Sequence, residues 1–386
     1  MSVQLLVDAP EFWAAFVRDA RGATSRLFVQ VLTFEADAAG QPLADLLLTL
    51  GPNVERRLIV DHYTHYFVND HFLYSPSSLV DRGLWREAKA TVRLVETLER
   101  DGVGVRWTNP IGWRLYRLSA RNHKKMFIVD DRVAYIGGFN LSDHNFAWHD
   151  LMLRFDDPAL VRFLTEDFLE TFRGRNQALD RSFDEGRLIL LDGLDGETLL
   201  KDVFDQIANA REEVFVESAY VSAPFFDALE TAARRGIRVV IFVPEVNNWR
   251  WYDAYTRIEC HRRGLELHCY EGRMHHVKAM LIDSRVLILG SCNFDYFAYH
   301  LHQELLFITA DEGLVRSFRE RVQARDLKRA RRVLLADDFP GELAGRPSGS
   351  VPAIPRRSGS TATSGPLSEL WRAEAAWAGG LVRTCS

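Results

Sequence analysis

Short apolar runs and amphipathic stretches alternate along the chain. Runs rich in β-branched and aromatic residues occupy 27–34 and 56–62, and stretches with helical spacing occupy 10–20 and 41–50. Continuous apolar runs of this length are typical of strands that are buried on both faces, whereas the amphipathic stretches are typical of helices that cover a sheet. The pattern predicts an α/β fold.

The same order of elements returns in the second half of the chain. A helix, a strand, a second helix and a second strand are predicted there at 202–210, 214–221, 225–236 and 237–244. Each half then continues with a further helix and a short strand, within 90–107 and 251–270. Self-similarity on this scale predicts two copies of one structural unit.

The most similar part of the two copies is a motif of the form H-x-K-x4-D. The segment RNHKKMFIVDDRVAYIGGFNLSD begins at residue 121, and MHHVKAMLIDSRVLILGSCNFD begins at residue 274. Four pairs of polar residues keep a constant offset of 153 positions: His123 and His276, Lys125 and Lys278, Asp130 and Asp283, Asn140 and Asn293. A constant offset without a gap predicts that the copies face each other as a pseudo-twofold pair around one site.

We therefore expect two domains followed by a tail. The N-terminal domain takes residues 1–180 with the first motif, and the C-terminal domain takes residues 181–336 with the second. Residues 337–386 are rich in Pro, Gly, Ser and Thr, and their apolar surface is too small to offset the entropy of ordering the chain. They are predicted to be a disordered tail, with a short amphipathic helix around Trp371 and Trp377 as the alternative.

Within each motif the spacing decides which side chains meet. The histidine and the lysine lie two residues apart on a strand, so both side chains leave the same face. Asp130 and Asp283 follow five residues after the lysine, which points them to the opposite face and favours a structural part in the motif. A turn of small residues then brings Asn140 or Asn293 close to a ligand.

Two histidines on either side of one phosphate suit a displacement at phosphorus in two steps. One imidazole attacks phosphorus, and the other protonates the departing alkoxide and then accepts the proton of the incoming alcohol or water. The lysines and asparagines would hold the non-bridging oxygens, where charge builds up in the transition state. Because the lysines supply positive charge, we expect no metal and no cofactor.

An imidazole that transfers protons also needs a partner at its second nitrogen. Asp150 lies 27 residues after His123, and Glu304 lies 28 residues after His276. We predict that these two carboxylates orient the imidazoles.

The two motifs, HxKx4Dx6GGxN and HxKx4Dx6GSxN, resemble the signature of the phospholipase D superfamily. With GGFNLSD followed by Trp148-His149-Asp150, the first copy looks most like bacterial cardiolipin synthases of the soluble subgroup without transmembrane segments. The resemblance runs over about residues 5–325 in organisation. One departure is Tyr296-Phe297 after GSCNFD, where many synthases continue with Arg-Ser.

The resemblance implies two tandem phospholipase D-like α/β/α repeats, packed as a pseudo-twofold pair with one shared active site. It also implies a phosphatidyltransferase of the cardiolipin synthase type with a phosphohistidine intermediate, in which His123 is the nucleophile and His276 the acid and base. One alternative is a phosphodiesterase or nuclease that uses water as the acceptor. Another is a catalytically silent scaffold, against which the intact His, Lys and Asn residues of both copies argue.

Charge and composition restrict the partners and the location. The formal net charge of −5 argues against an obligate nucleic-acid packager, and we expect no nucleic-acid partner. The resemblance implies an anionic phospholipid, such as phosphatidylglycerol, with an alcohol acceptor. The four cysteines show no disulfide framework, which favours a reducing compartment. Because no apolar run reaches the length of a membrane span, we expect a cytoplasmic protein, peripheral at the inner face of the cell membrane.

Three further segments are candidates for contacts with the substrate or a membrane. The basic, aromatic stretch GWRLYRLSARNHKK at 112–125 is interpreted as a rim for anionic lipid headgroups or a nucleic-acid backbone, or else as a solvated loop. The histidines of 61–72 are expected to line the pocket rather than to bind a metal. A basic helix at 317–332 is expected to be a solvated face, with a membrane-surface role as the alternative.

We also expect apolar walls that exclude water from the phosphohistidine. These residues are Trp113, Tyr116, Phe139, Phe146 and Trp148 near the first motif, and Phe294, Tyr296 and Phe297 near the second. Such walls predict that transfer to an alcohol exceeds hydrolysis.

Overall fold

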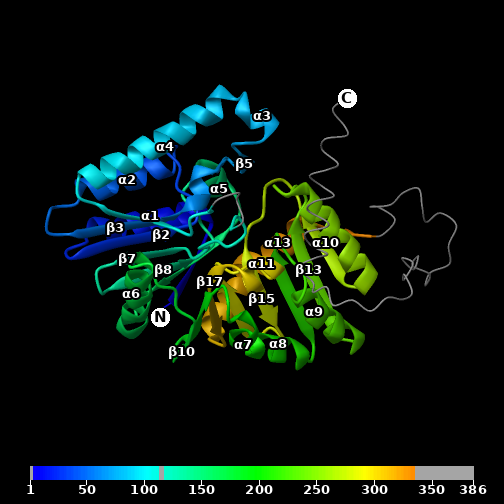
Figure 1. Cartoon of the computed structure of the whole chain (residues 1–386). Coiled ribbons are helices and arrows are strands. Elements are labelled where there is room, and N and C mark those ends of the chain that lie inside the picture. Colours follow the sequence, from blue (N-terminus) through cyan, green and yellow to red (C-terminus); the bar gives the residue numbers. More distant parts are fainter. Residues whose placement is uncertain (1–2, 113–116, 335–386) are drawn as a thin grey trace. The chain divides into compact units, whose positions relative to one another are not determined.

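A computed structural model describes residues 3–112 and 117–334, which all belong to one compact unit (Figure 1). The predicted tail at 337–386, with its alternative helix around Trp371 and Trp377, lies outside the described residues. None of the helices within those two ranges is both long and apolar enough to cross a membrane.

The first half of the chain builds a seven-stranded mixed sheet in the order β1-β9-β8-β7-β2-β3-β6. Its strands β2, β3 and β6 are parallel to one another, and the other neighbours pair antiparallel. The strand bounds are β1 Val3–Val7, β2 Arg26–Val31, β3 Glu55–Asp61, β6 Gly104–Thr108, β7 Met126–Val129, β8 Val133–Gly137 and β9 Leu151–Phe155.

Helices cover both faces of this sheet, as the apolar pattern predicts. Figure 1 shows α1 (Asp8–Arg21), α2 (Gly40–Thr49) and α4 (Arg82–Arg100) on one side and α6 (Pro158–Phe172) on the other. The first three helices bury one apolar cluster against the sheet, which includes Phe12 and Leu43. The residues of β2 are buried alternately by this cluster and by the one on the other face, which explains the continuous apolar run.

The second half builds a nine-stranded mixed sheet in the order β10-β11-β17-β16-β15-β12-β13-β14-β18. Its bounds are β10 Leu179–Phe183, β11 Gly186–Asp192, β12 Glu213–Ser218, β13 Arg238–Pro244, β14 Glu266–Tyr270, β15 Lys278–Ile282, β16 Val286–Gly290, β17 Gln303–Thr309 and β18 Ala330–Val333. One face is covered by α8 (Lys201–Ala208), α9 (Phe225–Arg234) and α10 (Arg250–Arg263).

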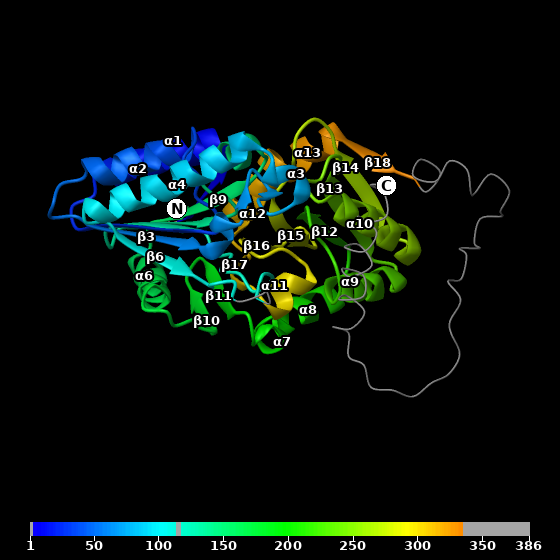
Figure 2. The ribbon, with the colours of Figure 1, turned by 45° about the horizontal axis from the view of Figure 1, so that its top comes forward.

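The two sheets share one hydrophobic core. A single cluster joins α6 and the first sheet to the second sheet and α12 (Glu312–Phe318). At its centre the rings of Phe155 and Phe307 meet edge to face, with centroids 5.0 Å apart. Figure 2 shows the sheets next to each other, with β16 and β17 beside the first half. The predicted fold class, a pair of packed α/β repeats, is confirmed.

Two predicted helices have different bounds in the structure. Helix α4 begins at Arg82, well before residue 90, because the Asp81 carboxylate accepts the N–H groups of Gly83 and Leu84 and caps the helix. The predicted basic helix at 317–332 is wrong at its end. Helix α13 (Ala324–Arg329) stops at Arg329, and the next four residues form the edge strand β18.

The expected boundary at residue 180 falls inside β10, which begins at Leu179 and pairs with β11 of the second sheet.

Candidate active site

Two short β-bridges join the halves next to the motifs. In one bridge Asn122 lies beside Gln303, and in the other His149 lies beside His275. Each bridge contains two backbone hydrogen bonds between the halves, with lengths of 2.8 to 2.9 Å. The bridges occupy corresponding positions of the two repeats, so the segment that leads into each motif is held by the other half.

This arrangement crosses the orienting carboxylates between the halves. His123 Nδ1 lies 2.7 Å from Glu304 Oε1, and His276 Nδ1 lies 2.6 Å from Asp150 Oδ2. All four side chains are more than nine-tenths buried. The two predicted carboxylates do contact the imidazoles, but the pairing that their order along the chain suggests is wrong. Each carboxylate serves the histidine of the opposite half.

The turn after each motif explains how the carboxylates fit. At Gly138 a Cβ would lie 2.1 Å from Asp150 Oδ1, so the turn has room for this carboxylate only because it carries no side chain. The corresponding residue of the second copy is Ser291, whose Oγ donates to Glu304 Oε2 at 2.5 Å. The single difference between the GG and GS turns therefore changes the hydrogen bonding of the two carboxylates.

The motif lysines are buried beside the histidines. Lys125 Nζ donates to the backbone oxygen of His123 at 2.8 Å, and Lys278 Nζ donates to that of His276 at 2.5 Å. Burial lowers the pKa of Lys125 to about 7, with a further contribution from the charge of Lys278. Burial likewise lowers the pKa of Lys278 to about 8. Two lysine side chains in one buried site, with the charge of Lys278 acting on Lys125, favour the binding of an anion.

Both imidazoles are neutral when no substrate is bound. Burial lowers the pKa of His123 to about 3, although the charge of Glu304 opposes this shift. Burial and then the charges of Lys278 and Lys125 hold the pKa of His276 well below its ordinary value. His276 Nδ1 is hydrogen-bonded to Asp150, and His123 Nδ1 lies beside Glu304 Oε1 and is hydrogen-bonded to the backbone oxygen of Ser291. With the proton at Nδ1, each ring has a free electron pair at Nε2, the atom that a nucleophile or a base uses.

The carboxylates differ in charge state. Burial alone would raise the pKa of Glu304, but the neighbouring His123 and Lys125 hold it well below its ordinary value. Burial raises the pKa of Asp150 to about 6, and Lys278 only partly opposes this. The histidine of the first motif thus faces the more firmly ionised partner.

The remaining motif residues support the backbone around the site. Asp130 accepts the backbone N–H groups of Thr24, Ser25 and Arg26, and Asp283 accepts those of 211–213. These bonds anchor the starts of β2 and β12, the strands beside each motif strand.

The two motif asparagines differ in their contacts. Asn140 Oδ1 accepts the N–H of Leu32 at 3.2 Å. Asn293 Oδ1 is buried without a hydrogen-bond partner among the described residues.

The structure changes the predicted walls of the site. The ring of Trp148 lies 5.0 Å from that of His276, so it borders the second motif rather than the first. Phe139 and Phe294 are wrong as walls, because both belong to the hydrophobic cores; Phe139 stacks on Phe12 with centroids 5.5 Å apart. Trp113 and Tyr116 lie outside the described residues.

The predicted basic rim at 112–125 is wrong for the residues next to the motif. Arg121 is buried and pairs with Asp61 at 2.7 Å, and Lys124 is buried and pairs with Asp167 at 2.6 Å. Their charges are used inside the protein and do not face a headgroup. Residues 113–116 of this stretch lie outside the described part of the chain.

The histidines of 61–72 do not form a metal-ligand group among the described residues. His62 and His65 pack beside Trp107, with the rings of His65 and Trp107 4.0 Å apart. Burial lowers the pKa of both His62 and His65.

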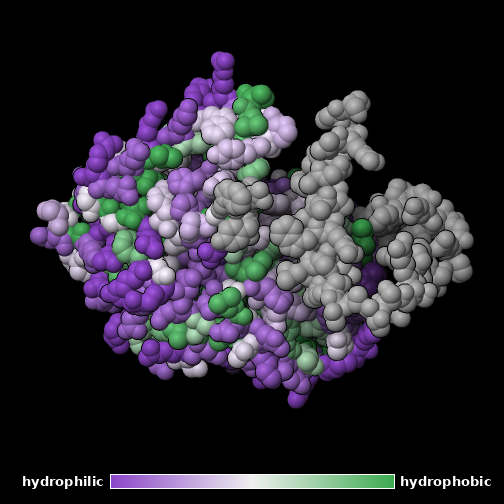
Figure 3. Space-filling model, in the orientation of Figure 1, coloured by the Kyte–Doolittle hydropathy of each residue, from purple (hydrophilic) through white to green (hydrophobic). Residues whose placement is uncertain are grey.

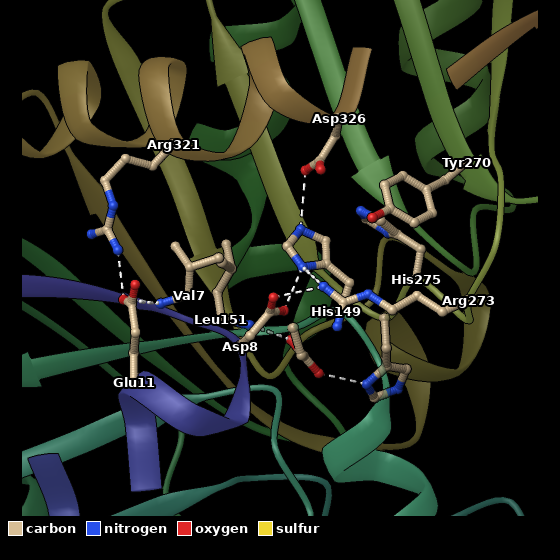
Figure 4. Close-up of polar contacts among 12 residues, drawn as sticks. Val7, Asp8, Glu11, His149, Leu151, Tyr270, Arg273, His275, Arg321 and Asp326 are labelled. Carbon is tan, nitrogen blue, oxygen red and sulfur yellow. Dashed lines mark hydrogen bonds and ion pairs between the residues drawn. The ribbon is translucent and has the colours of Figure 1, made fainter. Parts of the chain in front are cut away.

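A buried charge network lies directly behind the second motif (Figure 4). His149 Nδ1 lies 2.6 Å from Asp8 Oδ1, and its Nε2 lies 3.0 Å from Asp326 Oδ2. Although burial works against it, Asp326 and Asp8 raise the pKa of His149 to about 10. The resulting imidazolium joins the start of α1 to α13 and fixes the backbone beside Asp150. The sequence does not reveal this network, because the partners of His149 lie 141 and 177 positions away along the chain.

Comparison with known proteins places this geometry in a family. The family described as cardiolipin synthase, PLD-like domain, matches residues 17–172 and 203–325. The chain belongs to this family. Membership confirms the prediction of a phosphatidyltransferase of the phospholipase D superfamily.

Several curated relatives are similar over most of the chain. Cardiolipin synthase A of Pseudomonas putida (strain W619) is 27% identical over 367 residues, which span 87% of this chain and 70% of that protein. Cardiolipin synthase of Oceanobacillus iheyensis is 22% identical over 359 residues, which span 85% and 69%.

Two solved structures share the fold. Phosphatidylserine synthase of Haemophilus influenzae superimposes with a TM-score of 0.66 at 15% identity, covering 86% of this chain and 87% of that one. Polyphosphate kinase of Porphyromonas gingivalis superimposes with a TM-score of 0.58 at 12% identity, covering 86% and 48%. At these identities the likeness concerns the fold alone.

Proposed function

We propose that this protein is a phosphatidyltransferase of the cardiolipin synthase type. It takes a phosphatidyl group from an anionic phospholipid such as phosphatidylglycerol and passes it to the hydroxyl of a second lipid or of glycerol. The observation that carries this proposal is the pair of neutral, buried imidazoles, each oriented by a carboxylate of the other half and each next to a buried lysine.

The first step forms a phosphohistidine. His123 Nε2 attacks phosphorus, the bond from phosphorus to the departing glycerol oxygen breaks, and His276 delivers the proton that this oxygen needs. The phosphodiester brings a negative charge into the site, which favours the protonated form of His276. Lys125 and Lys278 hold the non-bridging oxygens as charge builds up on them.

The second step reverses the proton transfer. His276 accepts the proton of the incoming hydroxyl, whose oxygen bonds to phosphorus while the bond to His123 breaks.

The unequal carboxylates support this assignment of roles. A phosphorylated imidazole that keeps its Nδ1 proton is positively charged, and an ionised carboxylate at Nδ1 stabilises it. Glu304 is the more firmly ionised of the two, and it faces His123.

The test is the product formed from phosphatidylglycerol in mixed micelles. We expect cardiolipin, or another phosphatidyl-alcohol when that alcohol is added, to exceed free phosphatidic acid. Chelation with EDTA should leave the rate within about twofold, because the lysines supply the charge. If phosphatidic acid is the main product at every alcohol concentration, the protein is a hydrolase. We place the enzyme at the cytoplasmic face of the membrane, peripherally bound.

A further inference from the structure

Exposed apolar side chains gather on two segments, one from each half of the protein. The first segment runs from Asp70, just before β5 (His71–Phe72), to Val80, just after α3 (Pro76–Leu79). The second segment, 246–251, is a loop that ends in the first two residues of α10. Together they carry six of the eleven large apolar side chains that are exposed among the described residues. We call these six the apolar rim: Tyr74, Leu79, Val80, Val246, Trp249 and Trp251, with exposed fractions from 37% for Trp249 to 80% for Val80.

The two segments of the rim touch each other. Asn248 Nδ2 donates to Asp70 Oδ2 at 3.3 Å, which joins the loop of the second half to the turn between β4 (Phe67–Val68) and β5 of the first half. Asn248 is also hydrogen-bonded to the hydroxyl of Tyr220, whose ring lies 6.3 Å from that of His276. The rim is therefore connected to His276, the histidine of the second motif.

The second route from the rim to the site runs through the first half. Asp70 lies 3.6 Å from His144 Nε2. The His144 ring is 5.2 Å from Trp148, and Trp148 is 5.0 Å from His276. The two routes come from opposite halves and end on the same imidazole, so contacts from both halves join the rim to His276.

A basic stripe begins directly after the rim. Helix α4 carries Arg82, Arg86, Lys89 and Arg93 at spacings of four, three and four residues, which places them on one face of the helix. All four are exposed, and none forms an ion pair within residues 3–112 and 117–334. Figure 3 shows hydrophilic side chains along the upper edge, over α4, next to apolar residues at α3.

We propose that the apolar rim and the basic stripe dock the protein on an anionic phospholipid bilayer, with the rim entering the headgroup boundary around the entrance of the active site. This inference rests on the proposed lipid substrate. Tryptophan and aliphatic side chains favour the headgroup boundary, and unpaired arginine and lysine favour anionic lipids. A folded protein bound across the rim would close the site to its substrate, whereas a bilayer presents the substrate there.

Binding to vesicles tests the docking surface separately from catalysis. The full chain carrying His123→Ala, which leaves the lipid intact, is sedimented with vesicles of phosphatidylcholine with or without phosphatidylglycerol. Three pairs of substitutions are added to it: Leu79→Gln with Val80→Gln, Trp249→Ala with Trp251→Ala, and Arg82→Glu with Lys89→Glu. A basic residue near an anionic surface strengthens binding about fivefold, and an apolar side chain that enters the headgroup boundary adds to binding through its buried area. We therefore expect each pair to weaken binding to the anionic vesicles about tenfold or more.

Two control variants match these changes elsewhere on the surface. Leu194→Gln changes an apolar side chain that is 84% exposed, just before α7 (Gly196–Leu199), which lies on the opposite side of the molecule from α3 in Figures 1 and 2. Arg325→Glu with Lys328→Glu makes the same charge change on α13. Both controls should bind within about twofold of the parent.

The outcomes separate the docking surface from the proposed chemistry. With intact His123, the rim and stripe variants should lose activity on vesicles but keep it on a short-chain phosphatidylglycerol below its critical micelle concentration. Unchanged vesicle binding by all three pairs, or loss of binding with the α13 pair instead, would overturn the docking surface. If the protein with intact His123 binds vesicles through the rim but transfers no phosphatidyl group, the docking surface stands and the proposed function fails.

Discussion

The two halves of the active site follow one plan but hold their carboxylates differently. On the side of His123, Glu304 also accepts the hydroxyl of Ser291 and stays ionised. On the side of His276, Gly138 takes the place of that serine, and burial raises the pKa of Asp150 to about 6. A repeated unit thus supplies a symmetric framework, but the polar neighbours of the two carboxylates differ, and this makes the two histidines chemically unequal.

The largest effect is expected from removing either histidine. His123→Ala and His276→Ala should each lower the transfer rate by at least about a thousandfold, because each step of the reaction needs both imidazoles. The measurement is the initial rate of phosphatidyl transfer in mixed micelles. His300→Ala, on the exposed end of α11 (Tyr296–His300), is the matched control and should keep the parent rate. A single variant that retains more than a few per cent of the rate contradicts the paired mechanism.

The crossed pairing is tested by the carboxylates. Glu304→Gln and Asp150→Asn should each lower kcat about a hundredfold, because the amide no longer stabilises a positively charged imidazole. Nitrogen NMR of the histidine rings should show Glu304→Gln changing the signal of His123 and Asp150→Asn changing that of His276. If each substitution instead changes the histidine of its own half, the pairing is not crossed.

Substitutions in the two turns should have the next largest effects, and the effects should differ between the halves. Gly138→Ser places a Cβ 2.1 Å from Asp150 Oδ1, so the carboxylate must move and kcat should fall about a hundredfold. Ser291→Gly removes one hydrogen bond to Glu304 and should lower kcat only about tenfold. Equal losses in the two variants would mean that the turns do not distinguish the halves.

A smaller effect concerns the lysines and pH. The empty site loses positive charge as the pH rises through about 7 for Lys125 and about 8 for Lys278, so KM for an anionic phosphodiester should rise over this range. Lys125→Arg, which stays charged, should remove the part of the rise near pH 7. A pH profile of KM that is identical in the parent and Lys125→Arg would contradict the pKa order.

The same lysines should make stability depend on pH. Their folded pKa values lie below the unfolded value, so the unfolded chain binds more protons between about pH 7 and 10. The contribution of these lysines to the free energy of unfolding should therefore rise with pH in that window, whereas His149, with its pKa raised to about 10, contributes the opposite slope. Denaturant unfolding of the parent and of Lys125→Met at pH 7 and 9 isolates the lysine: the parent should gain stability relative to the variant as the pH rises, and a relative loss contradicts the lowered pKa of Lys125.

Much of the fold and half of the site chemistry could be predicted from the sequence. The constant offset between the motifs predicted both the pair of repeats and the histidines and lysines of the site, because a repeat without a gap preserves the geometry of the unit. The structural part expected of Asp130 and Asp283 also agrees with their contacts, although both residues lie in the turn after the motif strand and not on it. The start of α4 was missed, although Asp81 before Arg82 carries the signal of an N-cap.

What the sequence did not predict depends on contacts between distant segments. The crossing of Asp150 and Glu304 follows from how the two halves face each other, which periodicity within one half does not contain. The basic stretch before the first motif was interpreted as a rim because the acidic partners of Arg121 and Lys124 lie far away along the chain. Asp61 is 60 positions from Arg121, and Asp167 is 43 positions from Lys124. The sequence also did not predict the basic stripe on α4, because only the packing of the helix shows that these side chains are exposed.

The central claim is that one shared site holds two unequal histidines and that His123 is the nucleophile. The most direct measurement is to map the covalent intermediate. Parent protein and His276→Asn are mixed with phosphatidylglycerol, denatured rapidly at alkaline pH, digested, and analysed by mass spectrometry for phosphatidyl-histidine. We expect the adduct on His123 in both proteins, with more of it in His276→Asn because the second step is slowed. An adduct on His276 of the parent protein would contradict it.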